Sequence, residues 1–127
     1  MTRTEAMEFC NGWLGAWTGN QPSLLIEFYH KDCLYRDPAI PEGLKGKDEL
    51  FAYLRKLLAK NPQWVWKADD VFSFEGGFAL RWNATIPLGK AVVHEQGLDL
   101  VFIKNGLISR NEVYFDRTAL LRAMKVL

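Results

Sequence analysis

The spacing of the hydrophobic residues changes near Gln63, and this change constrains the fold more than any other feature of the chain. Before it, apolar residues recur at helical spacing. After it, they alternate with polar residues, which is typical of strands. Turn signals such as Gly76-Gly77 and Asn105-Gly106 divide this second part into consecutive hairpins. Helices grouped ahead of hairpins predict an α+β fold, with three N-terminal helices packed in a curved antiparallel sheet.

The same pattern bounds the expected elements. Helices are expected over about 4–17, from residue 22 onward and over 47–60, with a short strand at 33–37 before the third helix. Four strands joined by tight turns follow, with a bulge or bend at Asp69-Asp70 and a short helix after residue 116. No repeat or linker interrupts the chain, so residues 1–127 are expected to form a single domain.

Composition argues against several classes of function. The chain has 127 residues, of which 49% are hydrophobic and 24% charged, as in ordinary globular proteins. A net charge of +1, with scattered Lys and Arg, gives no electrostatic reason to expect a nucleic-acid partner. No apolar run approaches a membrane span and no apolar signal region follows Met1, so we expect a cytoplasmic protein without a membrane partner.

Cofactor signals are absent from the sequence. Cys10 and Cys33 do not make a disulfide framework and are expected to be reduced thiols. His30 and His94 stand far apart, and no His or Cys spacing resembles a metal site. Without a glycine-rich phosphate loop, no nucleotide cofactor is implied. We therefore expect neither a metal nor a cofactor.

Five short motifs together carry a family resemblance. In chain order they are Tyr35-x-Asp37-Pro38, Gly46-x-Asp48-x-Leu50, Gly97-x-Asp99, Asn105-Gly106-x-Ile108 and Val113-Tyr114-Phe115-Asp116. Over nearly the whole chain this order resembles the nuclear transport factor 2-like superfamily, and most of all its SnoaL-like group. That group is similar in fold to polyketide cyclases, ketosteroid isomerases and limonene epoxide hydrolases. The resemblance implies a cone in which a bent sheet wraps a long helix around an internal pocket, and it implies the fold better than an activity.

Asp37 is the first candidate catalytic residue. It shares a strand face with Tyr35, so it would lie among aromatic rings if that face lines the cone. In the ketosteroid isomerases the Asp of a matching Asp-Pro pair is the general base, so the resemblance implies proton transfer by Asp37. The alternative is an Asx-type turn, in which Asp37 caps the loop at Pro38.

Asp99 is the second candidate. It lies in the middle of an apolar strand, where a charge is unusual unless it has a partner or a function. Its place before the Asn105-Gly106 turn resembles that of the isomerases' second Asp, which donates a hydrogen bond in its protonated form. The alternative is an exposed Asp that pairs with Arg81 or Arg110.

Two departures from the relatives argue against specific activities. Counting back from the Asp-Pro pair, the isomerases' helical Tyr corresponds to Trp13, whose indole N–H is a weaker acid and whose ring is bulkier. The Arg-x-Asp pair of the epoxide hydrolases has its nearest counterpart in Arg81-Trp82-Asn83, and Asn cannot act as the carboxylate. Steroid isomerisation and epoxide hydrolysis are both disfavoured.

The remaining candidate site residues are mostly aromatic. The five Trp residues could all be core residues, or some could hold a flat apolar ligand. We expect the ligand to be bound by Trp13, Trp17, Tyr35, Trp82, Asn111 and Phe115. For Asn111 the alternative is a place on the outer, solvated face of the sheet.

Strand 97–102 carries apolar residues on both faces, which suggests a covered outer sheet face. A homodimer through that face is the simplest cover.

The sequence thus predicts a pocket protein for a small apolar molecule. It is an isomerase or cyclase acting on a carbonyl compound with Asp37 as general base, or a non-catalytic ligand-binding or interaction domain of the same fold. The pair Asp37 and Asp99 favours the enzyme, and the missing Tyr favours the binding domain.

Overall fold

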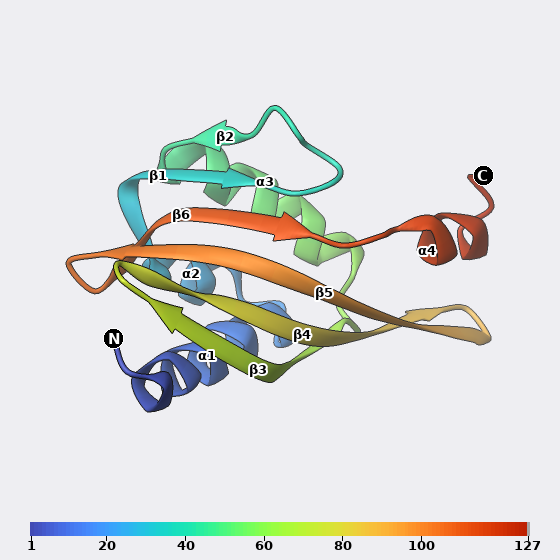
Figure 1. Ribbon diagram of the computed structural model, residues 1–127. Helices are drawn as coiled ribbons and strands as arrows, with labels where there is room; N and C mark the ends of the chain where they lie inside the picture. Colours follow the sequence, from blue (N-terminus) through green and yellow to red (C-terminus); the bar gives the residue numbers. More distant parts are fainter. Residues whose placement is uncertain (127) are drawn as a thin grey trace.

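A computed structural model describes residues 1–126 and has the expected α+β class, with helices packed on a single curved sheet (Figure 1). The elements are α1 (Arg3–Thr18), α2 (Pro22–Leu25), the 3-10 helix η1 (Ile26–Phe28), β1 (Tyr29–Arg36), β2 (Leu44–Lys45), α3 (Lys47–Lys60), β3 (Val65–Phe74), β4 (Gly77–Leu88), β5 (Ala91–Lys104), β6 (Leu107–Tyr114) and α4 (Thr118–Ala123).

The sheet has six strands in the order β2-β1-β6-β5-β4-β3. Strands β3 to β6 pair as the predicted antiparallel hairpins, and the expected irregularity lies between Ala68 and Asp70. The prediction of a purely antiparallel sheet is wrong, because β1 pairs with β6 in parallel. Turn signals identify hairpins between successive strands only, whereas β1 and β6 are separated in the chain by α3 and four strands, and a parallel pair needs such a long crossover.

Helices α1 and α3 pack near opposite ends of the strand order. α1 contacts β3 and α3 contacts β1, both on the concave face (Figure 1). Thr2 and Glu5 form a capping box that begins α1. The buried side of α3 is the leucine stripe Leu50, Leu54 and Leu58. This arrangement leaves the middle strands partly uncovered between the helices, where the cavity lies.

A glycine makes room for the largest side chain of the concave face. Trp82 of β4 pairs in register with Gly97 of β5. A Cβ atom at Gly97 would lie 2.2 Å from the Trp82 ring and 2.8 Å from Cβ of Phe115. No side chain fits at position 97, so the Gly97-x-Asp99 motif sets the place of both the Trp82 ring and the adjacent carboxylate.

Candidate functional site

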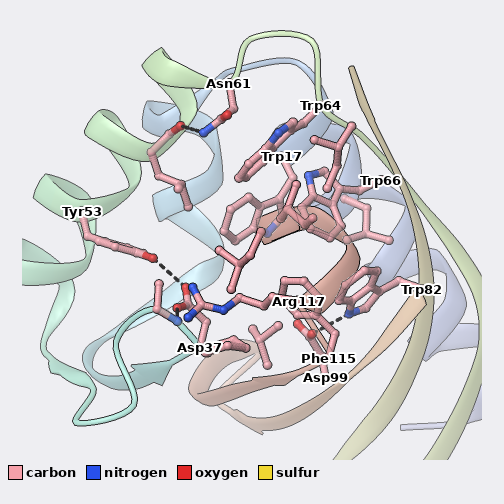
Figure 2. Close-up of a pocket in the computed structure, with 18 of the residues that line it drawn as sticks. Trp17, Asp37, Tyr53, Asn61, Trp64, Trp66, Trp82, Asp99, Phe115 and Arg117 are labelled. Atoms are coloured by element: carbon pink, nitrogen blue, oxygen red, sulfur yellow. Dashed lines mark hydrogen bonds between the residues drawn. The ribbon is translucent and has the colours of Figure 1, made fainter. Parts of the chain in front are cut away.

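A cavity of about 250 Å³ lies between the helices and the concave face of the sheet (Figure 2). Four of the five Trp residues line it: Trp17, Trp64, Trp66 and Trp82. The Trp82 ring packs edge-on against Trp66, at 4.7 Å between ring centroids, and against Phe115, at 5.3 Å. An apolar cavity with a few polar groups is the usual form of a small-molecule site.

Six of the eight predicted site residues line this cavity, namely Trp17, Tyr35, Asp37, Trp82, Asp99 and Phe115. Trp13 does not, contrary to the sequence expectation. Its ring is fully buried near Phe9, and its N–H has no hydrogen-bond partner among the described residues. Asn111 is also absent from the wall, because it is fully buried behind Asp99 and not on the outer face that was its alternative.

Asp99 is a buried carboxyl group with neutral partners. Its side chain is 5% exposed, with Oδ1 accepting from Trp82 Nε1 at 2.8 Å and Oδ2 from Asn111 Nδ2 at 3.0 Å. The alternative of an Arg81 or Arg110 partner is wrong, because those residues pair with other carboxylates. Burial raises the pKa of Asp99 to about 7, although both hydrogen bonds oppose the shift.

The network behind Asp99 extends to a residue that the sequence did not indicate. The Tyr29 hydroxyl donates to Asn111 Oδ1 at 2.8 Å, which fixes the amide so that its nitrogen faces Asp99. Burial, with a contribution from the Asp99 charge, raises the pKa of Tyr29, so the hydroxyl keeps its proton. The sequence pattern predicts a helix from residue 22 onward, whereas Tyr29 begins β1. Only the general need of a buried hydroxyl for a partner could have signalled its role.

Asp37 forms the Asx-type turn that was its alternative, and it also faces the cavity. Its Oδ1 accepts from the backbone N–H groups of Ala39 at 2.8 Å and Ile40 at 3.2 Å, which forms the Asx-type turn. Its Oδ2 accepts from the hydroxyls of Tyr35 at 2.8 Å and Tyr53 at 2.7 Å, on the cavity side. A carboxylate offers about four lone-pair sites, so these four donors occupy all of them.

The cavity residues that were not predicted as site residues include Tyr53, Trp64, Trp66 and Arg117. The alternation of Trp64 and Trp66 was a usable signal, since it places both rings on one face of the chain entering β3. Tyr53 lies beside the leucine stripe of α3, and Arg117 follows β6 in a connection without periodicity. Figure 2 shows the Arg117 side chain extending across the cavity toward Asp37.

The fold and the cavity together define a member of the nuclear transport factor 2-like superfamily. The family model described as the SnoaL-like domain matches residues 11–111, so the chain belongs to this family. No curated protein matches the chain.

Solved structures share the fold at low sequence identity. AclR from Streptomyces galilaeus is 15% identical, with 99% of each chain covered and a TM-score of 0.81. A candidate SnoaL-like polyketide cyclase from Jannaschia sp. CCS1 is 12% identical, with 98% of this chain and 94% of that chain covered and a TM-score of 0.82. An epoxide hydrolase of the LEH-like type from M. tuberculosis is 14% identical, with 98% and 92% covered and a TM-score of 0.78. At these identities the likeness concerns the fold alone.

Residues 1–126 show neither a cluster of possible metal ligands nor a helix that could cross a membrane. Nowhere in that range do three or more His, Cys, Asp or Glu side chains gather as they would around a metal ion. Within the same range, every helix is too short or too polar to cross a membrane.

Proposed function

We propose that the protein binds a small hydrophobic carbonyl compound in this cavity and catalyses an isomerase- or cyclase-type proton transfer on it. The observation that carries the proposal is Asp99, a buried carboxyl group on the cavity wall whose pKa is raised to about 7. A general acid–base catalyst works best with a pKa near the working pH, because both of its forms are then populated.

The surroundings of Asp99 suit that task. Trp82 and Asn111 each occupy one acceptor site and fix the carboxyl plane, so about two lone-pair sites remain for a substrate proton. As an anion, Asp99 would take a proton from the carbon next to the carbonyl, which breaks the C–H bond and leaves an enolate. Return of the proton from Asp99 to another carbon gives an isomer. Alternatively, the enolate carbon attacks a second carbonyl carbon and closes a ring, and the resulting alkoxide takes the proton back from Asp99.

Asp37 has the weaker claim to the general-base role that the sequence gave it. It faces the cavity, but it could take a substrate proton only by displacing one of its four donors. We therefore assign the proton transfer to Asp99. Asp37 holds the Tyr35 and Tyr53 hydroxyls in place at the cavity wall, and its general-base role remains the second assignment of this proposal.

Hydrogen–deuterium exchange tests the proposal without knowledge of the natural substrate. 1-Tetralone, a bicyclic aromatic ketone, is incubated in D2O and exchange next to its carbonyl is followed by NMR. We expect wild-type protein to accelerate exchange, Asp99→Asn to lose at least about 100-fold of that acceleration, and the outer-face control Glu112→Gln to retain it. Loss in Asp37→Asn with retention in Asp99→Asn would return the base role to Asp37. Binding without acceleration by wild type would support the non-catalytic ligand-binding domain.

We also propose a homodimer through the outer face of the sheet, the face turned away from α1 and α3. An apolar stripe of Leu98, Leu100 and Phe102 follows β5 there, and Leu98 is 37% exposed. Asp69 and Asp70 lie on the β3 side of the stripe, whereas Arg36 and Arg110 lie on the β1–β6 side. A two-fold axis at β5 would bury the apolar stripes of two copies against each other, flanked by these ion-paired side chains.

Sedimentation at micromolar concentration tests the assembly. We expect wild type to be a dimer and Leu98→Glu to be a monomer, because the new charge would lie on the two-fold axis without a partner. Leu24→Glu on α2 introduces the same change at another exposed position and should remain a dimer. A wild-type monomer would refute this part of the proposal.

A further inference from the structure

Arg117 is a positive charge on the cavity wall that has no partner among residues 1–126. It is the one Lys, Arg or His among the described residues that line the cavity, and its side chain is partly buried. Within residues 1–126 its guanidinium makes no side-chain hydrogen bond and no ion pair within 4.0 Å, although it carries five N–H donors. Of the other six arginines, four pair with acidic side chains, and the two without an ion pair among residues 1–126, Arg55 and Arg122, are exposed to solvent, whereas Arg117 is partly buried.

Asp37 is the nearest acidic group in Figure 2, yet it is already satisfied. Its carboxylate is held by Tyr35, Tyr53 and two backbone N–H groups. The guanidinium is nonetheless within electrostatic reach of this cluster. Burial and the hydrogen bond to Asp37 raise the pKa of Tyr53, and the Arg117 charge opposes that rise. The positive charge of Arg117 is thus close to the polar side of the cavity without being neutralised by a direct contact.

We propose that Arg117 binds an anionic group of the ligand, so that the cavity selects hydrophobic acids: aromatic or fused-ring compounds that carry a carboxylate or an ionised enol. This inference rests on the proposed function and names the substrate class of the same site. The tryptophan wall would hold the rings, and the guanidinium would hold the anion in the two-bonded geometry that arginine forms with carboxylates. Partial burial strengthens such a pair relative to one in water.

Two probes of nearly the same shape separate charge from apolar burial. 2-Naphthoate and 2-naphthamide share a planar fused ring and differ in the charge of one group. Their affinities are measured by calorimetry and by quenching of the tryptophan fluorescence. We expect wild type to bind naphthoate about tenfold or more tightly than naphthamide, as one charge-assisted hydrogen-bonded pair would provide. This ratio needs no variant, so it does not depend on the folding of a mutant.

Substitutions assign the preference to Arg117. Arg117→Gln should lose about tenfold in naphthoate affinity and less than about twofold in naphthamide affinity, and Arg117→Lys should lie between wild type and Arg117→Gln. Arg122→Gln removes the same charge from an exposed position on α4 and should change neither affinity.

The outcomes separate the inference from the proposed function. If both probes bind wild type equally, or if Arg117→Gln weakens both to the same degree, the inference is overturned while the apolar pocket stands. If neither probe binds wild type, the pocket itself is refuted and the inference falls with it.

Discussion

Asp99 and Glu112 are two carboxyl groups on neighbouring strands, β5 and β6, that point to opposite faces of the sheet. They are almost equally enclosed, at 5% and 6% exposure. Asp99 is held by the neutral donors Trp82 and Asn111, and burial raises its pKa to about 7. Glu112 accepts from Tyr114 at 2.6 Å and pairs with two arginines, and its pKa is lowered. Similar exposure thus accompanies opposite pKa shifts. Asp99 lies deep in the core, where desolvation dominates, whereas Glu112 lies near the outer surface, where the hydrogen bond from Tyr114 and the two arginines outweigh desolvation.

The two faces put their carboxylates to different uses. Glu112 pairs with Arg36 of β1 and with Arg110 of β6, so it ties together the parallel strands that the sequence pattern did not predict. A lowered pKa suits a fixed anion of this kind. Asp99 exists in both protonation states near neutral pH, which costs stability but allows proton exchange with a ligand. On the concave face Asp99 has no positively charged partner, whereas on the outer face Arg36 and Arg110 compensate the charge of Glu112.

Trp82→Ala should have the largest effect on stability, since it removes both the packing and one donor of the Asp99 site. The ring is buried against Trp66 and Phe115 and donates to Asp99. We expect a loss of about 3–5 kcal/mol in the free energy of unfolding, measured by urea denaturation. Phe72→Ala on the outer face, where the ring is 49% exposed, should cost less than about 1 kcal/mol. An unchanged midpoint for Trp82→Ala would show that this ring does not stabilise the core.

Asp99→Asn should stabilise the protein, but only at higher pH. The pKa of Asp99 is raised from 3.8 to about 7, so the folded state keeps a proton that the unfolded state releases. Wild-type stability therefore falls as the pH rises from about 4 to 7, by at most about 4 kcal/mol. Rotation of the Asn111 amide, with the Tyr29 hydroxyl as acceptor, would accommodate the new amide.

We expect Asp99→Asn to be more stable by about 2 kcal/mol at pH 8, with the gain vanishing toward pH 4, in urea unfolding at several pH values. The charged or titratable groups that act on Asp99 are Asp37, Cys10 and Tyr29. Burial raises the pKa of Cys10 to about 12 and that of Tyr29 also rises, so neither titrates in this range. A gain that does not depend on pH would contradict the proposed origin of the effect.

Much of this contrast could be predicted from the sequence. Alternation alone places Trp82 on the buried face of its strand, and a lone Asp99 in an apolar strand marks an unusual carboxyl group. The hairpins and the Asp69-Asp70 irregularity follow from the same local signals. Local pattern succeeds here because neighbouring strands in the chain are also neighbours in the sheet.

The rest depends on contacts that no local pattern encodes. Tyr29 meets Asn111 only because β1 pairs with β6, which lies far along the chain. Trp13 and Trp17 lie one turn apart on α1 and share its buried side, so periodicity could not tell that only Trp17 reaches the cavity. Arg117 enters the site from a connection without regular spacing, where sequence gives no direction for a side chain.

Glu112→Gln should destabilise the protein, with a pH dependence opposite to that of Asp99→Asn. The hydrogen bond from Tyr114 lowers the pKa of Glu112, and Arg36 and Arg110 act in the same direction. The stability that it contributes is present above the ordinary pKa of 4.5 and is lost as the pH falls through the lowered value. We expect a loss of about 1–2 kcal/mol at pH 7 in urea unfolding, shrinking below about pH 4.

Glu8→Gln, at an exposed position on α1, is the matched control and should change little. Equal destabilisation by Glu112→Gln at pH 7 and pH 3 would mean that shape and not charge matters on the outer face, and the contrast with Asp99 would be lost.

Asp37→Asn should have the smallest effect and is the sharpest test of which cavity carboxylate carries the proton. The amide keeps one oxygen for the backbone N–H groups of Ala39 and Ile40, while the Tyr35 and Tyr53 hydroxyls must turn to accept from its nitrogen. Such an exchange costs about 0.5–1 kcal/mol, so at pH 8 this variant should be slightly less stable than wild type while Asp99→Asn is more stable. If Asp37→Asn is instead the more stable protein at pH 8, an unfavourable carboxylate lies at position 37, and the general-base role would belong there and not to Asp99.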